Sequence, residues 1–347
     1  MTLDILALTC DEVAETLHRR YGKGRYHATG LYQAVFRHGA RGVSGTPAFM
    51  NSPALAKRLE HDVHFPACRI AAIQRQEVVK FALSLDDGAR IESVIIPGPR
   101  RTTLCISTQV GCAWGCRFCA TGAFGFVRDL STAEIVHQVL AARFELGYPV
   151  DNIVFMGMGE PLANFDNVMQ AIRVIGDQHG LDIAPSHVTI STAGHVDGIL
   201  RLAEALPPNL RLAVSLNAAN DELRDSLMPI NRVWPLATLK KALAAFPLGR
   251  GGIIFIEYVL LAGINDTREH AQELYRFLEG LPVRVNVIAY NGTRSGPFEA
   301  PSADDVQRFC AWLAEKKLFV RRRTPRGQGI LAACGQLGAA LEGTRLS

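Results

Sequence analysis

A strand–loop–helix pattern that repeats from about residue 100 onward is the feature that most restricts how this chain can fold. Six apolar runs predict strands, and helical stretches follow them: TTLCIS, NIVFMGM, HVTIST, LRLAVSL, IIFIEYVLL and VRVNVIAY. Several helices open with a capping box, at Ser131 with Glu134, Asp266 with Glu269 and Ser302 with Asp305. Strands that alternate with helices pair in parallel. We therefore expect an α/β fold, a partial (β/α)6 barrel with its chemistry at the carboxyl ends of the strands.

Two shorter regions precede the predicted barrel. Residues 1–75 show helical patterning without β alternation and are expected to form a small N-terminal helical domain. Residues 76–97 predict a β-hairpin linker, in which EVVKFALSL and RIESVIIP are joined by the turn Asp86-Asp87-Gly88. The remaining residues, 98–347, are long enough for one large α/β domain that ends in a tail.

The overall composition is that of a globular enzyme, with 48% hydrophobic and 20% charged residues. No window of about 18 uninterrupted apolar residues is present, and the most apolar one, GGIIFIEYVLLAGI, contains Glu257. The first twenty residues carry four acids and lack a basic start, so they do not match a signal peptide. We expect a cytoplasmic protein that has no contact with a membrane.

The net charge is only +4, so any affinity for nucleic acid must come from clustered basic residues. One cluster lies between His18 and Gly42, which hold no acid but contain Arg19, Arg20, Lys23, Arg25, Arg37 and Arg41, interleaved with Tyr21, Tyr26, Tyr32 and Phe36. A second cluster is Arg321-Arg322-Arg323. Each is either a solvated helix face or a nucleic-acid contact, where phosphates bind the charges and bases stack on the rings.

Eight cysteines are present, and three of them share one loop, in the order Cys112, Cys116 and Cys119. Three thiolates on a tight loop bind three irons of a 4Fe–4S cluster and leave the fourth iron open. Zinc is the alternative, but it usually takes four ligands, and no fourth Cys or His lies near in sequence. We expect the isolated Cys10, Cys68 and Cys310 to be packing residues. The Cys-x3-Cys-x2-Cys spacing, with Phe118 before the last cysteine, resembles the signature of radical S-adenosylmethionine (SAM) enzymes.

Polar residues follow the other predicted strands. Gly159 and Glu160, in MGMGEPLAN, resemble the GGE motif with which that superfamily holds the ammonium group of SAM. Further along the chain come the remaining candidate SAM contacts: Ser191, Ser215, Leu216, Asn217 and Asn291. A single Ser or Asn after a strand is usually a cap or turn residue. Because all of these are expected on one rim with the cysteine loop, we interpret them jointly as a SAM site.

Six stretches together resemble the RlmN/Cfr family of radical SAM RNA methyltransferases: TLCISTQVGCAWGCRFCATG, NIVFMGMGEPLANFDNV, TISTAGHVDGI, SLNAANDELRDSLMPINR, EYVLLAGIND and AACGQL. The resemblance runs from about residue 18 to 340. It implies methylation of one adenosine of 23S rRNA at carbon 2, and of some tRNAs, or at carbon 8 as in the antibiotic-resistance type. It also implies a 4Fe–4S cluster, SAM, an electron donor such as flavodoxin or ferredoxin, and a monomer.

Carbon 2 is favoured because it is the widespread housekeeping activity. Two readings from other classes stay open. One is a radical SAM enzyme that acts on a substrate other than RNA. The other is an RNA-binding protein that keeps a relic cluster.

The same resemblance implies roles for three further residues. Cys334 takes a methyl group from one SAM molecule, and a radical made from a second removes a hydrogen from it. The resulting carbon radical adds to the adenine ring, Glu92 accepts the ring proton, and Cys105 then attacks Cys334, which forms a disulfide and releases the RNA. Two positions depart from the family pattern: Gly329 stands where an aspartate is usual, and Asn217 where many relatives have histidine.

Overall fold

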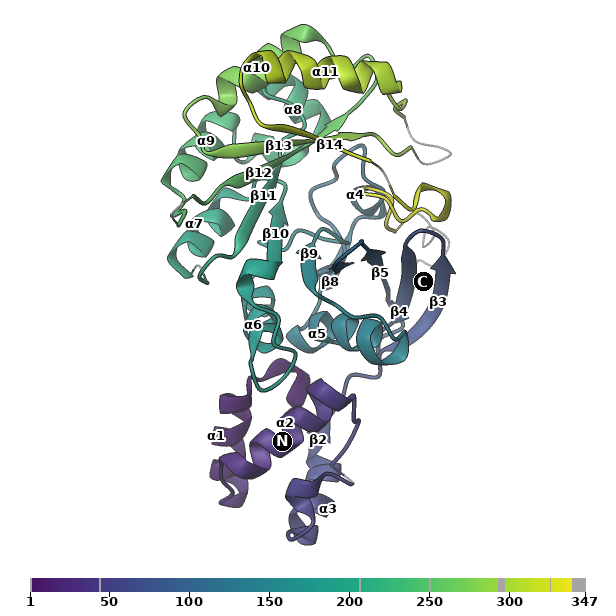
Figure 1. Ribbon diagram of the computed structural model, residues 1–347, viewed down its shortest axis with the longest axis vertical. Coiled ribbons are helices and arrows are strands. Elements are labelled where there is room, and N and C mark those ends of the chain that lie inside the picture. Colours follow the sequence, from purple (N-terminus) through teal and green to yellow (C-terminus); the bar gives the residue numbers. More distant parts are fainter. Residues whose placement is uncertain are drawn as a thin grey trace.

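The computed structural model describes residues 2–338, apart from residues 44, 206, 250, 293–296 and 325. Its centre is one ten-stranded sheet with the strand order β14-β13-β12-β11-β10-β9-β6-β5-β4-β3 (Figure 1). Seven neighbouring strands of this sheet are parallel, namely β6 (Thr102–Cys105), β9 (Asn152–Phe155), β10 (Val188–Thr192), β11 (Arg211–Ser215), β12 (Ile254–Leu260), β13 (Val283–Ala289) and β14 (Val320–Arg323). The six predicted barrel strands are confirmed. The seventh strand, β14, is not predicted from the sequence, in which Arg321-Arg322-Arg323 is only a basic run.

The other three strands extend this sheet beyond β6, and each is antiparallel to its neighbour: β3 (Arg69–Arg75), β4 (Val79–Ser84) and β5 (Arg90–Pro97). The predicted hairpin is therefore confirmed, with its turn at residues 86–88, but it continues the barrel sheet. The expectation that residues 1–75 are entirely helical is wrong for β3. β3 pairs with β4 at the edge of the sheet, and most of its residues are exposed. A strand in such a place does not need alternating apolar residues, so its sequence does not predict it.

Helices cover the outer face of the parallel strands (Figure 1). They are α5 (Thr132–Leu140, continued as a π-helix over Ala141–Glu145), α6 (Phe165–Gly176), α7 (Val196–Ala205), α8 (Asp221–Leu227), α9 (Leu236–Ala245), α10 (Arg268–Leu278) and α11 (Ala303–Glu315). The capping boxes at Ser131 and Ser302 are confirmed. The third lies one residue later than predicted, because Thr267 and His270 form the box while Asp266 accepts a bond from the Gly263 N–H group. The cysteine loop, with Cys112, Cys116 and Cys119, continues into a short helix, α4 (Ala120–Phe124). Loop and helix lie between the paired strands β7 (Gln109–Gly111) and β8 (Phe126–Asp129).

The helical segment at the amino terminus consists of α1 (Cys10–Tyr21), α2 (Arg25–His38) and α3 (Pro53–Asp62), with the short parallel pair β1 (Leu3–Asp4) and β2 (Val63–His64). It packs below α6 in Figure 1. Hydrogen bonds fix this contact: the Cys10 N–H group donates to Asp177, and Gln170 donates to the carbonyl oxygen of Ala7. Among the described residues, no helix has the length and apolarity that crossing a membrane requires.

The tail that follows β14 returns across the sheet to the hairpin strands. Arg326 donates to the carbonyl oxygens of Pro97 and Glu77 at 2.7 and 3.0 Å. Glu77 in turn accepts a bond from the Gly327 N–H group. A Cβ at Gly329 would lie 2.8 Å from Nε2 of Gln76, so the Gln76 side chain occupies the space into which an acidic side chain would extend. This gives a physical account of the departure at Gly329.

Candidate active site

A cavity lies at the carboxyl ends of the parallel strands, and residues of β9 to β14 form its wall. The cysteine loop and the tail complete the wall. Among the residues predicted from the sequence, nine line this cavity: Cys112, Cys116, Cys119, Gly159, Glu160, Ser191, Ser215, Asn217 and Cys334. Residues from five segments of the chain therefore meet in one place, as expected if a single ligand site occupies the rim.

The three cysteines of the loop face the cavity as free thiols. Burial and the neighbouring thiols raise the pKa of Cys116 well above its ordinary value, and burial raises the pKa of Cys112 to about 12. Among the described residues, no group of three or more His, Cys, Asp or Glu side chains is placed to hold a metal ion. A 4Fe–4S cluster makes a different demand, because each thiolate binds its own iron atom and the sulfurs need not converge on one point.

Trp114 lies within the same loop, and its indole indicates what kind of group the site can hold. Its indole Nε1 is buried without a hydrogen-bond partner among the described residues, and its side chain lines the cavity. Buried donors in folded proteins are nearly always bonded. The unpaired N–H group therefore fits a site that is completed by a group with acceptor atoms, such as the sulfides of a cluster or the carboxylate of SAM.

Glu160 is one of two carboxylates that line the cavity, the other being Glu257, and backbone groups hold it in place. Its Oε2 accepts a bond from the Ala193 N–H group at 2.7 Å, and its Oε1 accepts one from Leu162 at 3.1 Å. Burial raises its pKa to about 7, against the lowering effect of these donors. The preceding Gly159 has a φ of +98°, and a Cβ there would lie 2.5 Å from Cβ of Gln109. Only glycine therefore lets the loop turn Glu160 into the cavity.

The other predicted ligand residues divide into two groups. Ser191, Ser215 and Asn217 line the cavity, although the Asn217 Oδ1 already accepts a bond from the Val259 N–H group. Leu216 is fully buried in the core and does not line the cavity. Asn291 also lies outside the wall, because its Oδ1 accepts a bond from Gln328 of the tail at 2.5 Å. In this structure Asn291 therefore anchors the tail.

Arg224 holds two of these strand ends together. Its side chain is fully buried, and its guanidinium donates to the carbonyl oxygens of Ala193, Leu216 and Ser215. A fourth bond goes to Oδ1 of Asn231 at 2.9 Å. Burial lowers the pKa of Arg224 to about 10, against the raising effect of nearby negative groups. Nothing in the sequence singles out this residue, because an arginine in a polar helix is ordinarily exposed.

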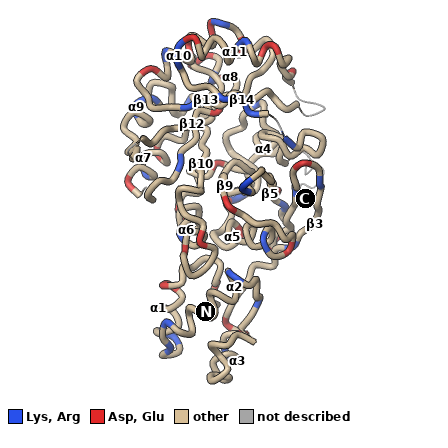
Figure 2. The backbone as a smooth tube through the Cα atoms, in the orientation of Figure 1, with Lys and Arg blue, Asp and Glu red and all other residues tan. Residues whose placement is uncertain are grey.

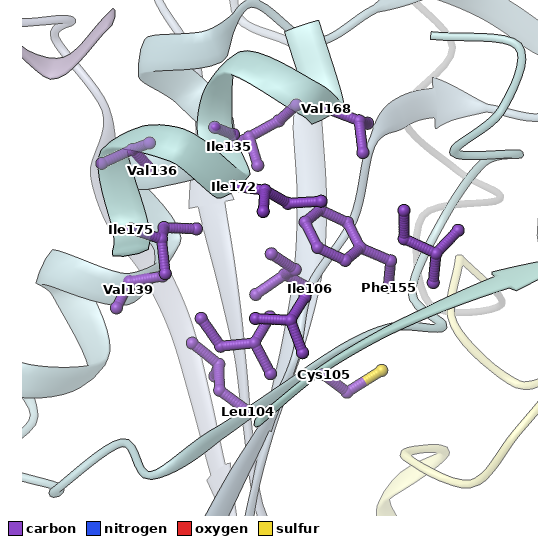
Figure 3. Close-up of a cluster of buried hydrophobic side chains, with 14 of the residues drawn as sticks. Leu104, Cys105, Ile106, Ile135, Val136, Val139, Phe155, Val168, Ile172 and Ile175 are labelled. Atoms are coloured by element: carbon purple, nitrogen blue, oxygen red, sulfur yellow. The ribbon is translucent and has the colours of Figure 1, made fainter. Parts of the chain in front are cut away.

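The two cysteines predicted to act together lie far apart in the sequence, and the fold brings both to the same end of the sheet: Cys334 lines the cavity, whereas Cys105, at the end of β6, does not. Cys105 ends β6, and its sulfur points away from the apolar cluster around Leu104 and Ile106 (Figure 3). Burial and the charge of Cys334 raise the pKa of Cys105 to about 12. The Cys334 side chain is exposed, and because it lines the cavity this exposed surface faces the cavity. The tail thus brings the two thiols within electrostatic reach.

Arg323 and Glu257 complete this part of the cavity, and the sequence did not identify them as site residues. Arg323 donates to Oε2 of Glu257 at 3.1 Å, and Glu257 accepts a second bond from Asn286 at 2.7 Å. Burial alone would lower the pKa of Arg323, but Cys334 and Glu257 raise it. Arg323 in turn opposes the rise that burial causes in the pKa of Cys334. Arg323 thus lines the cavity and pairs with Glu257, and its predicted contact with phosphate stays a prediction.

Glu92, the predicted proton acceptor, does not line the cavity. It is 2% exposed, and both of its carboxylate oxygens are bonded, one to Lys80 and the other to the Gly338 N–H group. Strand register nevertheless puts Glu92 on the same face of the sheet as Cys105. Val94 pairs with Cys105 across β5 and β6, and residues two apart in a strand share a face.

The aromatic residues interleaved with the N-terminal basic cluster are mostly buried. Tyr32 and Phe36 are fully buried in the core, and Tyr21 donates to Asp62. Tyr26 remains, with 70% of its surface exposed. The expectation that all four rings are available for stacking is thus wrong for Tyr32 and Phe36. These two lie four residues apart on α2, the spacing of a helix face that packs inward.

The comparisons with known proteins agree with this geometry. Residues 106–278 match the family model of the radical SAM superfamily. The chain is 44% identical to the dual-specificity RNA methyltransferase RlmN of Geobacter sulfurreducens, over 99% of this chain and 94% of the relative. It is 43% identical to the probable dual-specificity RNA methyltransferase RlmN 1 of Protochlamydia amoebophila, over 97% and 94%.

A solved structure gives the same result. A radical SAM methyltransferase from Sphaerobacter thermophilus superposes with a TM-score of 0.90 at 37% identity, over 97% of this chain and 99% of that one. This level of similarity over nearly the whole length covers the barrel, the N-terminal helices and the tail alike. The chain therefore belongs to the RlmN family of radical SAM RNA methyltransferases.

Proposed function

We propose that this protein is an RNA methyltransferase that transfers a methyl group from SAM to carbon 2 of an adenosine in 23S rRNA and in tRNA. The observation that carries this proposal is that the tail places Cys334 in the wall of the cavity that the cysteine loop also lines, with Cys105 at the end of β6, the strand beside β9 of that wall. An electron-poor ring carbon cannot attack a sulfonium methyl group, whereas a thiolate can. The full-length relatives named dual-specificity RNA methyltransferases support the same substrate class.

The cofactor site that goes with this function uses residues of the cavity wall. Cys112, Cys116 and Cys119 would hold a 4Fe–4S cluster, and Glu160 with the strand-end residues Ser191, Ser215 and Asn217 would hold SAM. When bound, the cluster and SAM supply the methyl group and a radical able to remove hydrogen from it. An external electron donor, such as flavodoxin or ferredoxin, would deliver the electron.

Three residues of the chain would then do the rest. Cys334 accepts a methyl group at Sγ, and Arg323 beside it favours the thiolate that this attack requires. Glu92 accepts the proton that the ring carbon loses after the new carbon–carbon bond forms. The unpaired electron left by the radical addition would return to the oxidised cluster. The Cys105 thiolate then attacks Sγ of Cys334, and the two sulfurs form a disulfide. The electron pair of the broken bond between sulfur and carbon goes to the methylene carbon, which takes up a proton and leaves as the methyl group of the RNA.

The ligand set leads to a compositional prediction. Anaerobic reconstitution should give about four irons and four acid-labile sulfides per chain. Replacing any one of Cys112, Cys116 and Cys119 by alanine should lower both values sharply, whereas Cys310→Ala, outside the cavity, should not. Iron and sulfide analysis measures this. Stoichiometric zinc without acid-labile sulfide would contradict both the cluster and the reaction.

RNA would contact the N-terminal helices through their basic residues. Figure 2 shows Lys and Arg positions at the far end of α1, away from the barrel. Arg19 and Arg25 are exposed, and Arg25 pairs with Asp11 only at the surface, where the two side chains are 62% and 74% exposed. Such a pair is worth little and a phosphate can displace it. On β14, Arg321 and Arg322 are exposed, while Arg323 is committed to Glu257.

Replacing Arg19, Arg20, Lys23 and Arg25 together by alanine should weaken RNA binding and flatten its dependence on salt. Each lost phosphate contact removes about 0.7 to 0.9 from the slope of log affinity against log salt. The double variant Arg321→Ala/Arg322→Ala should act in the same direction with a smaller effect. Arg268→Ala, on α10, is the control and should leave the slope unchanged. Binding titrations of an rRNA fragment at several salt concentrations measure this, and an unaltered slope in the first variant would refute the contact.

The function itself is tested by locating the methyl group. Adenosines of 23S rRNA and tRNA from cells with and without the gene are separated and identified by mass spectrometry. We expect 2-methyladenosine that depends on the gene. A product of 8-methyladenosine would indicate the carbon-8 reaction instead, and unmethylated RNA would refute the proposal.

A further inference from the structure

Lys80 is a buried charge for which the reaction described above has no use. It lies on β4, it is 4% exposed, and its Nζ is 3.1 Å from Oε1 of Glu92 on β5. The two side chains are 4% and 3% exposed. A buried ammonium is tolerated only when it is paired and hydrogen-bonded, so the pair must form as a unit.

The register of the sheet explains how the two groups meet. Lys80 pairs with Val94 across β4 and β5, which makes Glu92 its diagonal neighbour on the same face. Val94 pairs with Cys105 across β5 and β6. Lys80, Glu92 and Cys105 therefore share the face of the sheet over which the tail lies. Ser93, between Glu92 and Val94, faces the other way and donates to Gln138 of α5 at 2.7 Å.

Each member of the pair also holds the tail, on opposite sides of Cys334. Lys80 Nζ donates to the carbonyl oxygen of Leu331 at 3.4 Å. On the other side, the Gly338 N–H group donates to Oε2 of Glu92 at 2.7 Å. Leu331 has a φ of +54°, a conformation that costs free energy for a leucine and is kept only where neighbours fix it. The pair thus spans the segment that presents Cys334 to the cavity.

A contribution to overall stability does not account for this arrangement. A buried ion pair is often no more stabilising than a well-packed apolar pair of the same volume, because removing both charges from water is costly. What the pair adds is direction: two charged groups with fixed geometry bind two specific backbone atoms of the tail. An apolar pair at these positions would leave the Gly338 N–H group and the Leu331 carbonyl without these partners.

We propose that Lys80 is a positioning residue, which acts with Glu92 as a clasp that holds the segment Leu331–Gly338 against the hairpin and thereby fixes Cys334 at the cavity. The assignment of Cys334 as methyl carrier rests on the proposed function; the clasp itself does not. Each oxygen of the ionised Glu92 carboxylate accepts one of these bonds and keeps a further lone pair, so the carboxylate can hold the tail and still accept a proton.

The clasp is tested with Lys80→Met in the cluster-loaded protein without RNA. Amide hydrogen exchange of residues 332–338 should become at least about tenfold faster, because the tail loses the bond to Leu331 and the fixed geometry of Glu92. Alkylation of Cys334 by iodoacetamide should change with it, whereas that of Cys310, on α11, should not. Ser93→Ala is the matched control: it removes a buried hydrogen bond from β5, the strand of Glu92, on the opposite face of the sheet, and it should leave tail exchange unchanged.

Loss of folding would not hide the answer. Lys80→Met/Glu92→Leu removes both charges, so thermal stability should return toward that of the wild type while tail exchange stays fast. Lys80→Arg should restore slow exchange at least in part, because it keeps the charge. Unchanged tail exchange in a folded Lys80→Met protein would overturn the clasp, whatever the enzyme does to RNA. If exchange accelerates but the wild-type protein methylates no RNA, the clasp stands and the proposed function fails.

Discussion

Replacing Cys105 by alanine is expected to leave the enzyme covalently joined to its RNA. The variant can still form S-methylcysteine at Cys334 and add the carbon to the adenine ring, because neither step involves Cys105. It cannot break the bond between Cys334 and the methylene group, since the attacking thiol is gone. Multiple turnover should fall by at least about a thousandfold, which corresponds to ~4 kcal/mol of activation free energy.

Denaturing gel electrophoresis measures this, because the stalled species migrates as a protein–RNA conjugate that both ribonuclease and protease degrade. Cys334→Ala should form no conjugate, and it should still bind cluster and SAM. Cys68→Ala is the control for a buried cysteine that lies outside the cavity and should behave as wild type. Normal turnover by Cys105→Ala, or an adduct that peptide mapping places away from Cys334, would show that the two-cysteine reaction does not occur here.

Arg224→Met is expected to lower the free energy of unfolding by about 3–5 kcal/mol, a value typical of losing one partner from a buried charged network. The carbonyl oxygens of Ala193 and Leu216 and the Asn231 amide would lose their donors in a fully buried place. The ends of β10 and β11 would then move apart, so affinity for SAM should fall more than the loss of stability alone explains. Chemical denaturation and calorimetric titration of SAM into cluster-loaded protein measure the two effects.

Arg143→Met is the matched control for this prediction. Arg143 also donates to two carbonyl oxygens, those of Leu181 and Val150, but these precede β10 and β9 at the opposite end of the sheet. It should destabilise the protein while leaving affinity for SAM close to that of the wild type. Equal losses of SAM affinity in the two variants would mean that Arg224 has no special part in shaping the cavity.

The sequence predicts six of the seven parallel strands, because a strand that is buried on both faces is a continuous apolar run. The cysteine loop, Gly159 and Glu160 are equally visible, since their chemistry depends on short local spacing. Local patterns fail where a role depends on tertiary neighbours. Arg323 sits in a basic run that suggests a surface, and only the pairing of β13 with β14 places its side chain against Glu257.

The same limit applies to residues whose function is to hold the tail. Asn291 follows a strand, as a ligand residue would, and nothing in the sequence shows that Gln328 donates a hydrogen bond to it. Lys80 stands in an apolar run, where an isolated lysine is ordinarily a position that faces solvent. Its burial follows from the return of the tail over the hairpin, a contact between residues some 250 positions apart in the chain. No periodicity encodes such a contact.

The central claim is that the methyl group reaches RNA through Cys334, and a label-transfer measurement tests it most directly. Protein is prepared with deuterated methyl on Cys334, identified by peptide mass spectrometry, and is then mixed with unlabelled SAM and an rRNA fragment for a single turnover. If the methyl group passes through Cys334, we expect the first 2-methyladenosine formed to carry deuterium from the protein and unlabelled methyl to appear only in later turnovers. Unlabelled methyl in the first product, with the deuterated group still on Cys334, would contradict it.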